Sequence, residues 1–225
     1  MTNTTLETFG FLTSPARRRL ALLLVAWFGL AAIAGTMGVF ATGPGPLFRP
    51  VALAAIGPIA AFLALYAASS GFRGFVLSRD LRVVTMLQAW RVVGFGFLLL
   101  YAHGVLPGLF AWPAGLGDVA VGLSAPLVVL ALARDPGFAA SRGFVVWNLL
   151  GLFDFVVAVT VAGLASGAIP ALVAGGVTSA PMEVWPLFLF PGFFVPLFAF
   201  LHLTALFQAR TLGREAAING LTKNV

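Results

Sequence analysis

Long apolar runs separated by short polar connections make up most of this chain. Six runs are nearly free of charge, and they cover residues 20–41, 51–71, 83–106, 116–133, 143–166 and 185–209. Each is close to the ~20 residues that a helix needs to cross a ~30 Å hydrocarbon core. Because no segment alternates as a membrane β-strand does, the runs predict helices. We therefore expect an all-α integral membrane protein with six transmembrane helices in a single helical bundle.

The composition indicates that lipid, rather than water, surrounds most of the chain. Of the 225 residues, 60% are hydrophobic and 9% are charged, whereas soluble domains carry about 25% charged residues. The expected organisation is a polar segment over 1–19, a transmembrane domain over 20–209 and a polar tail over 210–225. The chain has no cysteine, which excludes disulfides, thiolate metal sites and cysteine nucleophiles.

The basic residues are unevenly distributed over this layout. Arg91 lies inside a run, and Arg49 lies in the connection between the first two runs. The remaining basic residues all fall on the opposite side from Arg49: Arg17, Arg18, Arg19, Arg73, Arg79, Arg82, Arg134, Arg142, Arg210, Arg214 and Lys223. Cytoplasmic loops carry such an excess, so we expect a bacterial-type inner (plasma) membrane protein with both termini cytoplasmic. Because the charges are spread over short connections, the expected partner is the lipid bilayer and not nucleic acid.

A few polar residues interrupt the apolar runs. Helical rise places Asp154 ~16 Å from the inner surface, Arg91 ~12 Å, His202 ~11 Å and Asn148 ~8 Å. These four residues form a candidate ligand- or ion-binding site in the inner half of the membrane. Arg91 could instead extend its guanidinium to the headgroups, and Asn148 could hydrogen-bond between helices. Asp154 is too short to reach the surface from this depth, so we expect a functional role for it, as a proton or cation relay or a polar anchor for a ligand. The alternative is a neutral carboxylic acid that holds helices together.

A second polar set is expected near the outer mouth of the bundle and contains Asp118, His103 and Tyr101. Asp118 lies two residues into its run, where a carboxylate could instead complement the helix dipole. The expected depths of His103 and His202 differ by ~19 Å, whereas one haem needs both axial ligands at a common depth. Haem held by a single histidine is the remaining alternative, and no cofactor is predicted. Known hydrolase, phosphate-loop and zinc patterns are missing from the sequence, so no catalytic residue and no metal site are predicted.

Residues 90–122 contain three short motifs: WRVVG at 90–94, LPGLF at 106–110 and AGLGD at 114–118, followed by Gly122. This segment resembles the helix pair of DoxX-like small bacterial membrane proteins. Those proteins have an Arg and a Gly opening one helix, a Leu-Pro turn and an acidic residue ahead of a Gly-rich helix. The chain departs from them in having six runs rather than four, and in having Asp118 where a Glu is usual. The resemblance implies an accessory membrane subunit beside redox or quinone partners, with Arg91 and Asp118 as the matching polar positions.

The predicted function is binding or transport of a small, largely hydrophobic solute or a coupling ion through a sparse polar site within the membrane. Phenylalanines in the last run would suit such a ligand, or they could face lipid. One alternative is a non-catalytic accessory subunit of a membrane redox or quinone complex. Another is an intramembrane enzyme that uses Asp154 and His202 as an acid–base pair. A membrane-complex partner or a homo-oligomer is compatible with each of these functions.

Overall fold

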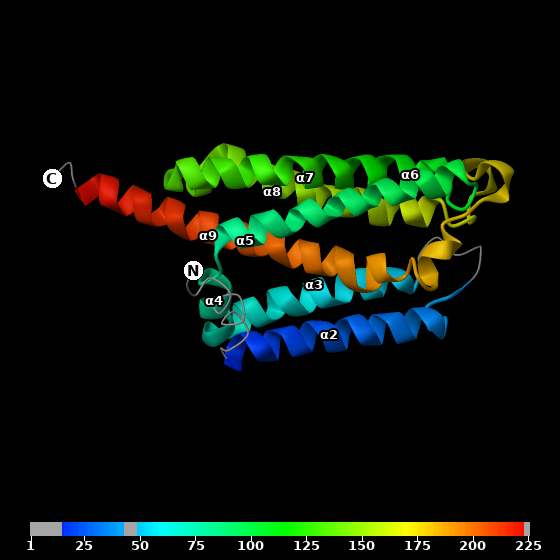
Figure 1. The fold of residues 1–225 in the computed structure, drawn as a ribbon, viewed down its shortest axis with the longest axis horizontal. Helices are drawn as coiled ribbons and strands as arrows, with labels where there is room; N and C mark the ends of the chain where they lie inside the picture. Colours follow the sequence, from blue (N-terminus) through cyan, green and yellow to red (C-terminus); the bar gives the residue numbers. More distant parts are fainter. Residues whose placement is uncertain (1–14, 43–48, 223–225) are drawn as a thin grey trace, which may run out of the picture.

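The computed structural model describes residues 15–42 and 49–222 of the chain (Figure 1). Six helices within these residues are long and apolar enough to cross a membrane. The described residues form helices and connections, with no strand among them. The predicted all-α class with six spans is therefore confirmed. Residues 1–14 of the expected N-terminal segment and Lys223 of the expected tail lie outside the described residues.

Four of the six spans are single α-helices, and the other two are built from consecutive helical elements of different types. The elements of the spans are, in chain order, α2 (Pro15–Thr36), α3 (Val51–Ala68), α5 (Leu81–Met86) with η1 (Leu87–Gly94) and α6 (Phe95–Ala102), α7 (Gly108–Arg134), α8 (Arg142–Leu164), and η6 (Phe190–Phe194) with α9 (Val195–Thr222). The short α4 (Ser70–Leu77) follows α3. η1 is a 3₁₀ helix and η6 is a π-helical turn. Such irregular stretches within long helices often occur at functional sites.

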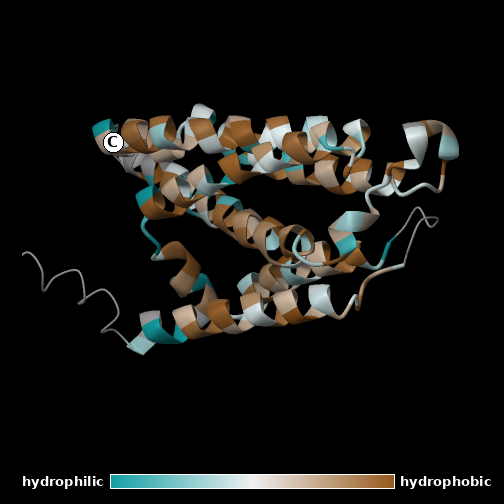
Figure 2. Cartoon of the chain, turned by 45° about the vertical axis from the view of Figure 1, so that its right-hand side comes forward, coloured by the Kyte–Doolittle hydropathy of each residue, from teal (hydrophilic) through white to brown (hydrophobic). Residues whose placement is uncertain are grey.

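Consecutive spans run in opposite directions, so the start of α2 and the end of α9 lie at the same end of the bundle (Figure 1). We call this the basic end, because the helix termini there carry Arg134, Arg142 and most other basic residues. The opposite loop end holds the described residues 37–42 and 49–50 of the first connection, and the connections 103–107 and 165–189. Hydrophobic residues cover the lengths of the helices, and hydrophilic residues gather mostly at the basic end (Figure 2). α9 continues helically into the expected tail as far as Thr222.

The start of α7 differs from the sequence-based expectation. The sequence PGLFAWPAG at 107–115 predicts a connection, but the helix begins at Gly108 and continues through Pro113. Membrane helices tolerate internal prolines because side chains, water and neighbouring helices can satisfy the freed backbone groups. This earlier start of α7 changes the depth of Asp118. Asp118 lies ten residues, or ~15 Å, into the helix, and not at its outer edge.

α7 packs closely against η1, whereas α2 lies at the periphery of the bundle. A Cβ placed on Gly122 would lie 2.6 Å from the backbone nitrogen of Val92, so the glycine allows α7 to approach η1. α2 lies on the opposite side of the bundle from α7 and α8 (Figures 1 and 2). Its contacts with the rest of the chain include Trp27, whose ring centre lies 4.9 Å from that of Phe193, and Gly35, whose carbonyl accepts from the backbone N–H of Trp185 at 3.1 Å. The tightly packed part of the fold is therefore formed by the later helices.

Candidate functional site

Arg91 joins four elements in the middle of the bundle. Its Nε donates to Asp118 Oδ1 on α7 at 2.7 Å, and its Nη2 donates to Asp154 Oδ2 on α8. Its Nη1 donates to the carbonyl of Gly151 at 3.2 Å and lies 3.1 Å from His202 Nε2 on α9. Arg91 itself lies on η1 and is 1% exposed. The alternative in which its guanidinium reaches the headgroups is therefore wrong.

His202 and Asn148 extend these contacts towards the backbone of α8. A guanidinium can only donate, so His202 Nε2 accepts from Arg91 and the ring proton lies on Nδ1. Nδ1 donates this proton to Asn148 Oδ1, with the two atoms 2.9 Å apart. Asn148 Nδ2 in turn donates to the carbonyl of Phe144 at 2.9 Å. We call Arg91, Asp118, Asp154, His202 and Asn148 the charge cluster. Within the charge cluster, Asn148 therefore links α8 to α9 through an inter-helix hydrogen bond.

Aromatic side chains enclose the charge cluster. The guanidinium carbon of Arg91 lies 4.1 Å from the centre of the Phe155 ring, a favourable cation–π distance. The ring of Trp147 meets the His202 ring edge-on, with centres 5.4 Å apart. His202 and Asn148 are each at most 1% exposed. Water is therefore largely excluded from this side of the cluster, which strengthens its electrostatic interactions.

Three glycines leave the space that the cluster occupies. The nearest atoms to a Cβ placed on each would be Asp118 Cβ at 2.3 Å for Gly94, Asp154 Oδ1 at 1.6 Å for Gly117 and His202 Nε2 at 2.2 Å for Gly151. Real Cβ atoms do not approach so closely, so any larger residue would displace a member of the cluster. None of the three glycines is among the site residues predicted from the sequence. Gly117 directly precedes Asp118 in the sequence, but the side chain that lies beside it is that of Asp154.

The structure separates the three residues expected at the outer mouth. Asp118 contacts Arg91 in the cluster, so its expected grouping with His103 and Tyr101 is wrong, because α7 begins earlier than predicted. His103 caps the end of α6 and is exposed. Tyr101 is also exposed, and its ring lies 5.9 Å from that of Trp112. These two residues remain at the loop end, away from the charge cluster.

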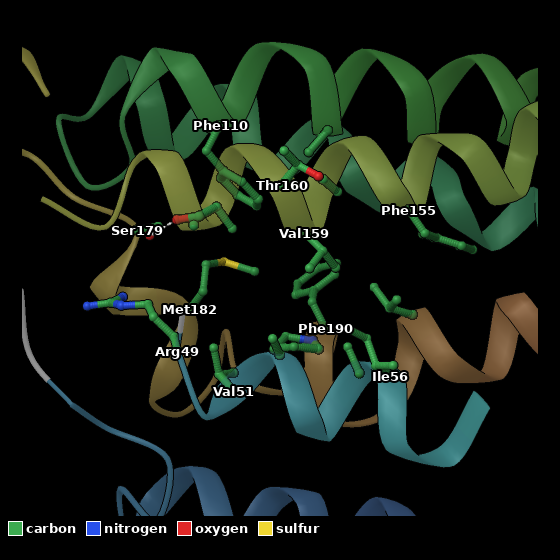
Figure 3. Close-up of a pocket in the computed structure, with 18 of the residues that line it drawn as sticks. Arg49, Val51, Ile56, Phe110, Phe155, Val159, Thr160, Ser179, Met182 and Phe190 are labelled. Atoms are coloured by element: carbon green, nitrogen blue, oxygen red, sulfur yellow. Dashed lines mark hydrogen bonds between the residues drawn. The ribbon is translucent and has the colours of Figure 1, made fainter. Parts of the chain in front are cut away.

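A cavity of about 340 Å³ lies between the charge cluster and the loop end. Its walls come from α3, α6, α7, α8 and η6, and Asp118 and Asp154 line it. Figure 3 shows α8 along one side and α3 along the other, with apolar side chains between them. The aromatic lining residues are Phe97, Phe110, Phe155 and Phe190. The cavity is thus apolar over most of its wall and acidic at the end nearest the middle of the bundle.

The rim of the cavity faces the outside of the helix bundle. Ile56 on α3 lines the cavity and is 46% exposed, and Thr160 on α8 is an exposed lining residue. Figure 3 shows both residues on their facing helices. In a membrane, lipid chains surround this part of the bundle. The cavity therefore borders the outside of the bundle between α3 and α8.

An ion pair lies at the loop end of the cavity, where Arg49 is one of the lining residues. Arg49 Nη1 lies 3.1 Å from Glu183 Oε1, and both residues are at most 4% exposed. Glu183 Oε2 also accepts the backbone N–H of Thr42 at 2.8 Å. These contacts tie the connection 37–50 to the connection 165–189. They also give Arg49, which breaks the charge asymmetry, a buried partner of opposite charge.

The contacts of Arg91 and His202 bear on the alternative in which Asp154 and His202 act as an acid–base pair. Arg91 lies between Asp154 and His202, and both ring nitrogens of His202 are engaged. His202 is fully buried and is not among the residues that line the cavity. Asp154 and His202 therefore do not face a common space in which a substrate could lie between them. This geometry does not fit Asp154 and His202 acting together as an acid–base pair on one substrate.

The fold and the cluster define a polytopic helical membrane protein with buried charges beside an apolar cavity. The chain belongs to the family described as a domain of unknown function, DUF8737, whose model matches residues 48–210. The match begins just before α3 and contains every residue of the charge cluster. No curated protein and no solved structure matches the chain.

Proposed function

We propose that this protein binds a small, largely apolar solute in the cavity and transports it within or across the membrane. The observation that carries the proposal is the form of the cavity, which has an apolar wall and two carboxylates at its inner end. Binding sites for small molecules have this character, with a few polar groups that fix orientation in a mostly hydrophobic wall. The rim between α3 and α8 supports uptake of the solute from the lipid.

Retention of a bound molecule tests this proposal. Protein extracted in mild detergent should carry a small molecule that native mass spectrometry detects, and Asp154→Asn should reduce its occupancy at least tenfold. The reason is that Asp154 forms part of the polar end of the cavity, whereas the substitution alters the side-chain volume little. Asp135→Asn is the matched control, because Asp135 is exposed in the connection between α7 and α8. Absence of any retained molecule, or equal retention in both variants, would contradict the proposal.

We also propose that the basic end faces the cytoplasm, in the inner membrane of a bacterial-type cell. The excess of arginine at this end supports the orientation. Because the chain has no cysteine, single cysteines report on it directly. A membrane-impermeant maleimide should label Ala171→Cys, in an exposed position at the loop end, in intact cells. Ala140→Cys, exposed at the basic end, should react only after lysis. The reverse pattern would show the opposite orientation.

A further inference from the structure

The charges of the cluster do not balance. One guanidinium faces two carboxylates, so the ionised cluster carries one net negative charge. His202 adds no charge of its own, because its Nε2 accepts from Arg91. An uncompensated charge in a low-dielectric interior is costly. The cluster therefore favours whatever brings one positive charge to it.

The excess negative charge is accessible from the cavity, whereas the compensating cation is not. The side chains of Asp118 and Asp154 are 14% and 11% exposed, but that of Arg91 is 0% exposed. Arg91 uses one oxygen of each carboxylate. Among the described residues, the other two oxygens accept no hydrogen bond. A molecule in the cavity thus meets the carboxylates and not the guanidinium.

The walls beside the carboxylates also suit a cation. The Arg91 guanidinium lies near one face of the Phe155 ring, and Phe155 also lines the cavity. The rings of Phe97 and Phe190 lie 4.5 Å apart in the same wall. Aromatic faces attract ammonium groups while providing apolar contact area. At the loop end Arg49 is ion-paired with Glu183, so the uncompensated charge of the cavity lies at its inner end.

We infer that the ligand is a small lipophilic organic cation, such as an amine or quaternary ammonium with an apolar or aromatic body. Its charged group lies against Asp118 and Asp154, and its apolar body extends along the phenylalanine wall towards the loop end. This inference rests on the proposed function, since it assigns the chemical class of the solute. It also gives the two carboxylates separate roles from Arg91: they contact the ligand, and Arg91 holds them in place.

Two probes of equal shape separate charge from hydrophobicity. Benzyltrimethylammonium is a quaternary cation, and neopentylbenzene is its uncharged carbon isostere. Binding of each to the full-length protein in lipid nanodiscs is measured for wild type, Asp118→Asn, Asp154→Asn and the exposed control Asp135→Asn. Comparing each probe between variants cancels its partition into lipid. Each single Asn substitution leaves Arg91 with one carboxylate, so the cluster becomes neutral without leaving the guanidinium unpaired.

We expect benzyltrimethylammonium to bind at least tenfold more weakly, or about 1.4 kcal/mol, to Asp118→Asn and Asp154→Asn than to wild type. Neopentylbenzene should bind all four proteins equally. Equal loss of both probes in the Asn variants would overturn the inference, because it would indicate a collapsed cavity. Equal binding of the cation to wild type and to the Asn variants would also overturn the inference. It would indicate that a proton, and not the ligand, supplies the compensating charge. If wild type binds neither probe, the proposed function fails together with the inference.

Discussion

Replacing Arg91 with methionine is expected to lower the free energy of unfolding by about 3–5 kcal/mol, the usual cost of removing one partner from a buried ion pair. Methionine retains much of the side-chain volume but leaves Asp118 and Asp154 without a cation. It also removes the donor to His202 and to the carbonyl of Gly151. The measurement is reversible unfolding of the purified protein in mixed micelles, with denaturing detergent as the variable.

Two further variants identify the cause of this loss. Arg134→Met is the matched control, because Arg134 is exposed at the end of α7, and it should change the stability by less than about 1 kcal/mol. Adding Asp118→Asn and Asp154→Asn to Arg91→Met should restore most of the stability, because no buried charge then remains. If the triple variant is no more stable than Arg91→Met, the destabilisation comes from lost packing around Arg91 rather than from unpaired carboxylates.

Gly117→Ala is expected to abolish cation binding while costing about 1–3 kcal/mol of stability, the usual range for an overpacked interior. The added methyl group would lie 1.6 Å from Asp154 Oδ1 and 2.5 Å from its carboxyl carbon. Asp154 must therefore rotate away, which breaks its contact with Arg91. Binding of benzyltrimethylammonium and unfolding in mixed micelles measure the two effects.

A second glycine and a double variant provide the controls for Gly117→Ala. Gly96 is also helical, and a Cβ placed on it meets nothing within 4 Å, so Gly96→Ala should leave binding and stability unchanged or slightly raise the stability. In an Asp154→Ala background the space beside Gly117 is vacant, so Gly117→Ala should add little further cost. An undiminished cost in that background would contradict the steric explanation, because the coupling between the two positions would be absent.

The charge cluster combines structural and binding roles, and the geometry assigns these roles to different atoms. Arg91, His202 and Asn148 form a buried chain of hydrogen bonds that joins η1, α8 and α9. Asp118 and Asp154 each accept from Arg91 with one oxygen and border the cavity. This division explains why the two probes and the stability measurements test separate properties of the same cluster. Changes on the His202 side should act mainly on stability, and changes on the carboxylate side mainly on binding.

Part of the candidate site could be predicted from the sequence, and part could not. Asp154 and Arg91 were selected because charged side chains within a span need a partner or a wet cavity, and the structure places them in contact. Asp118 was assigned the wrong depth, because Pro107 and Pro113 suggested a turn where α7 continues. Gly117 and Gly151 were not selected, since the sequence gives no sign of which side chain approaches a given glycine.

The lipid surroundings and the helical architecture of this protein follow from its amino-acid sequence alone. Apolar runs of membrane length require helices, because lipid offers no partner for backbone N–H and C=O groups. Which polar residues meet depends on the three-dimensional packing, because contacts between α7, α8 and α9 are set by helix rotation and depth. The hydrophobic pattern specifies helix rotation and depth poorly when all faces of a helix are apolar. The glycines that allow close approach and the early start of α7 together bring Asp118 and Asp154 to one arginine beside one cavity.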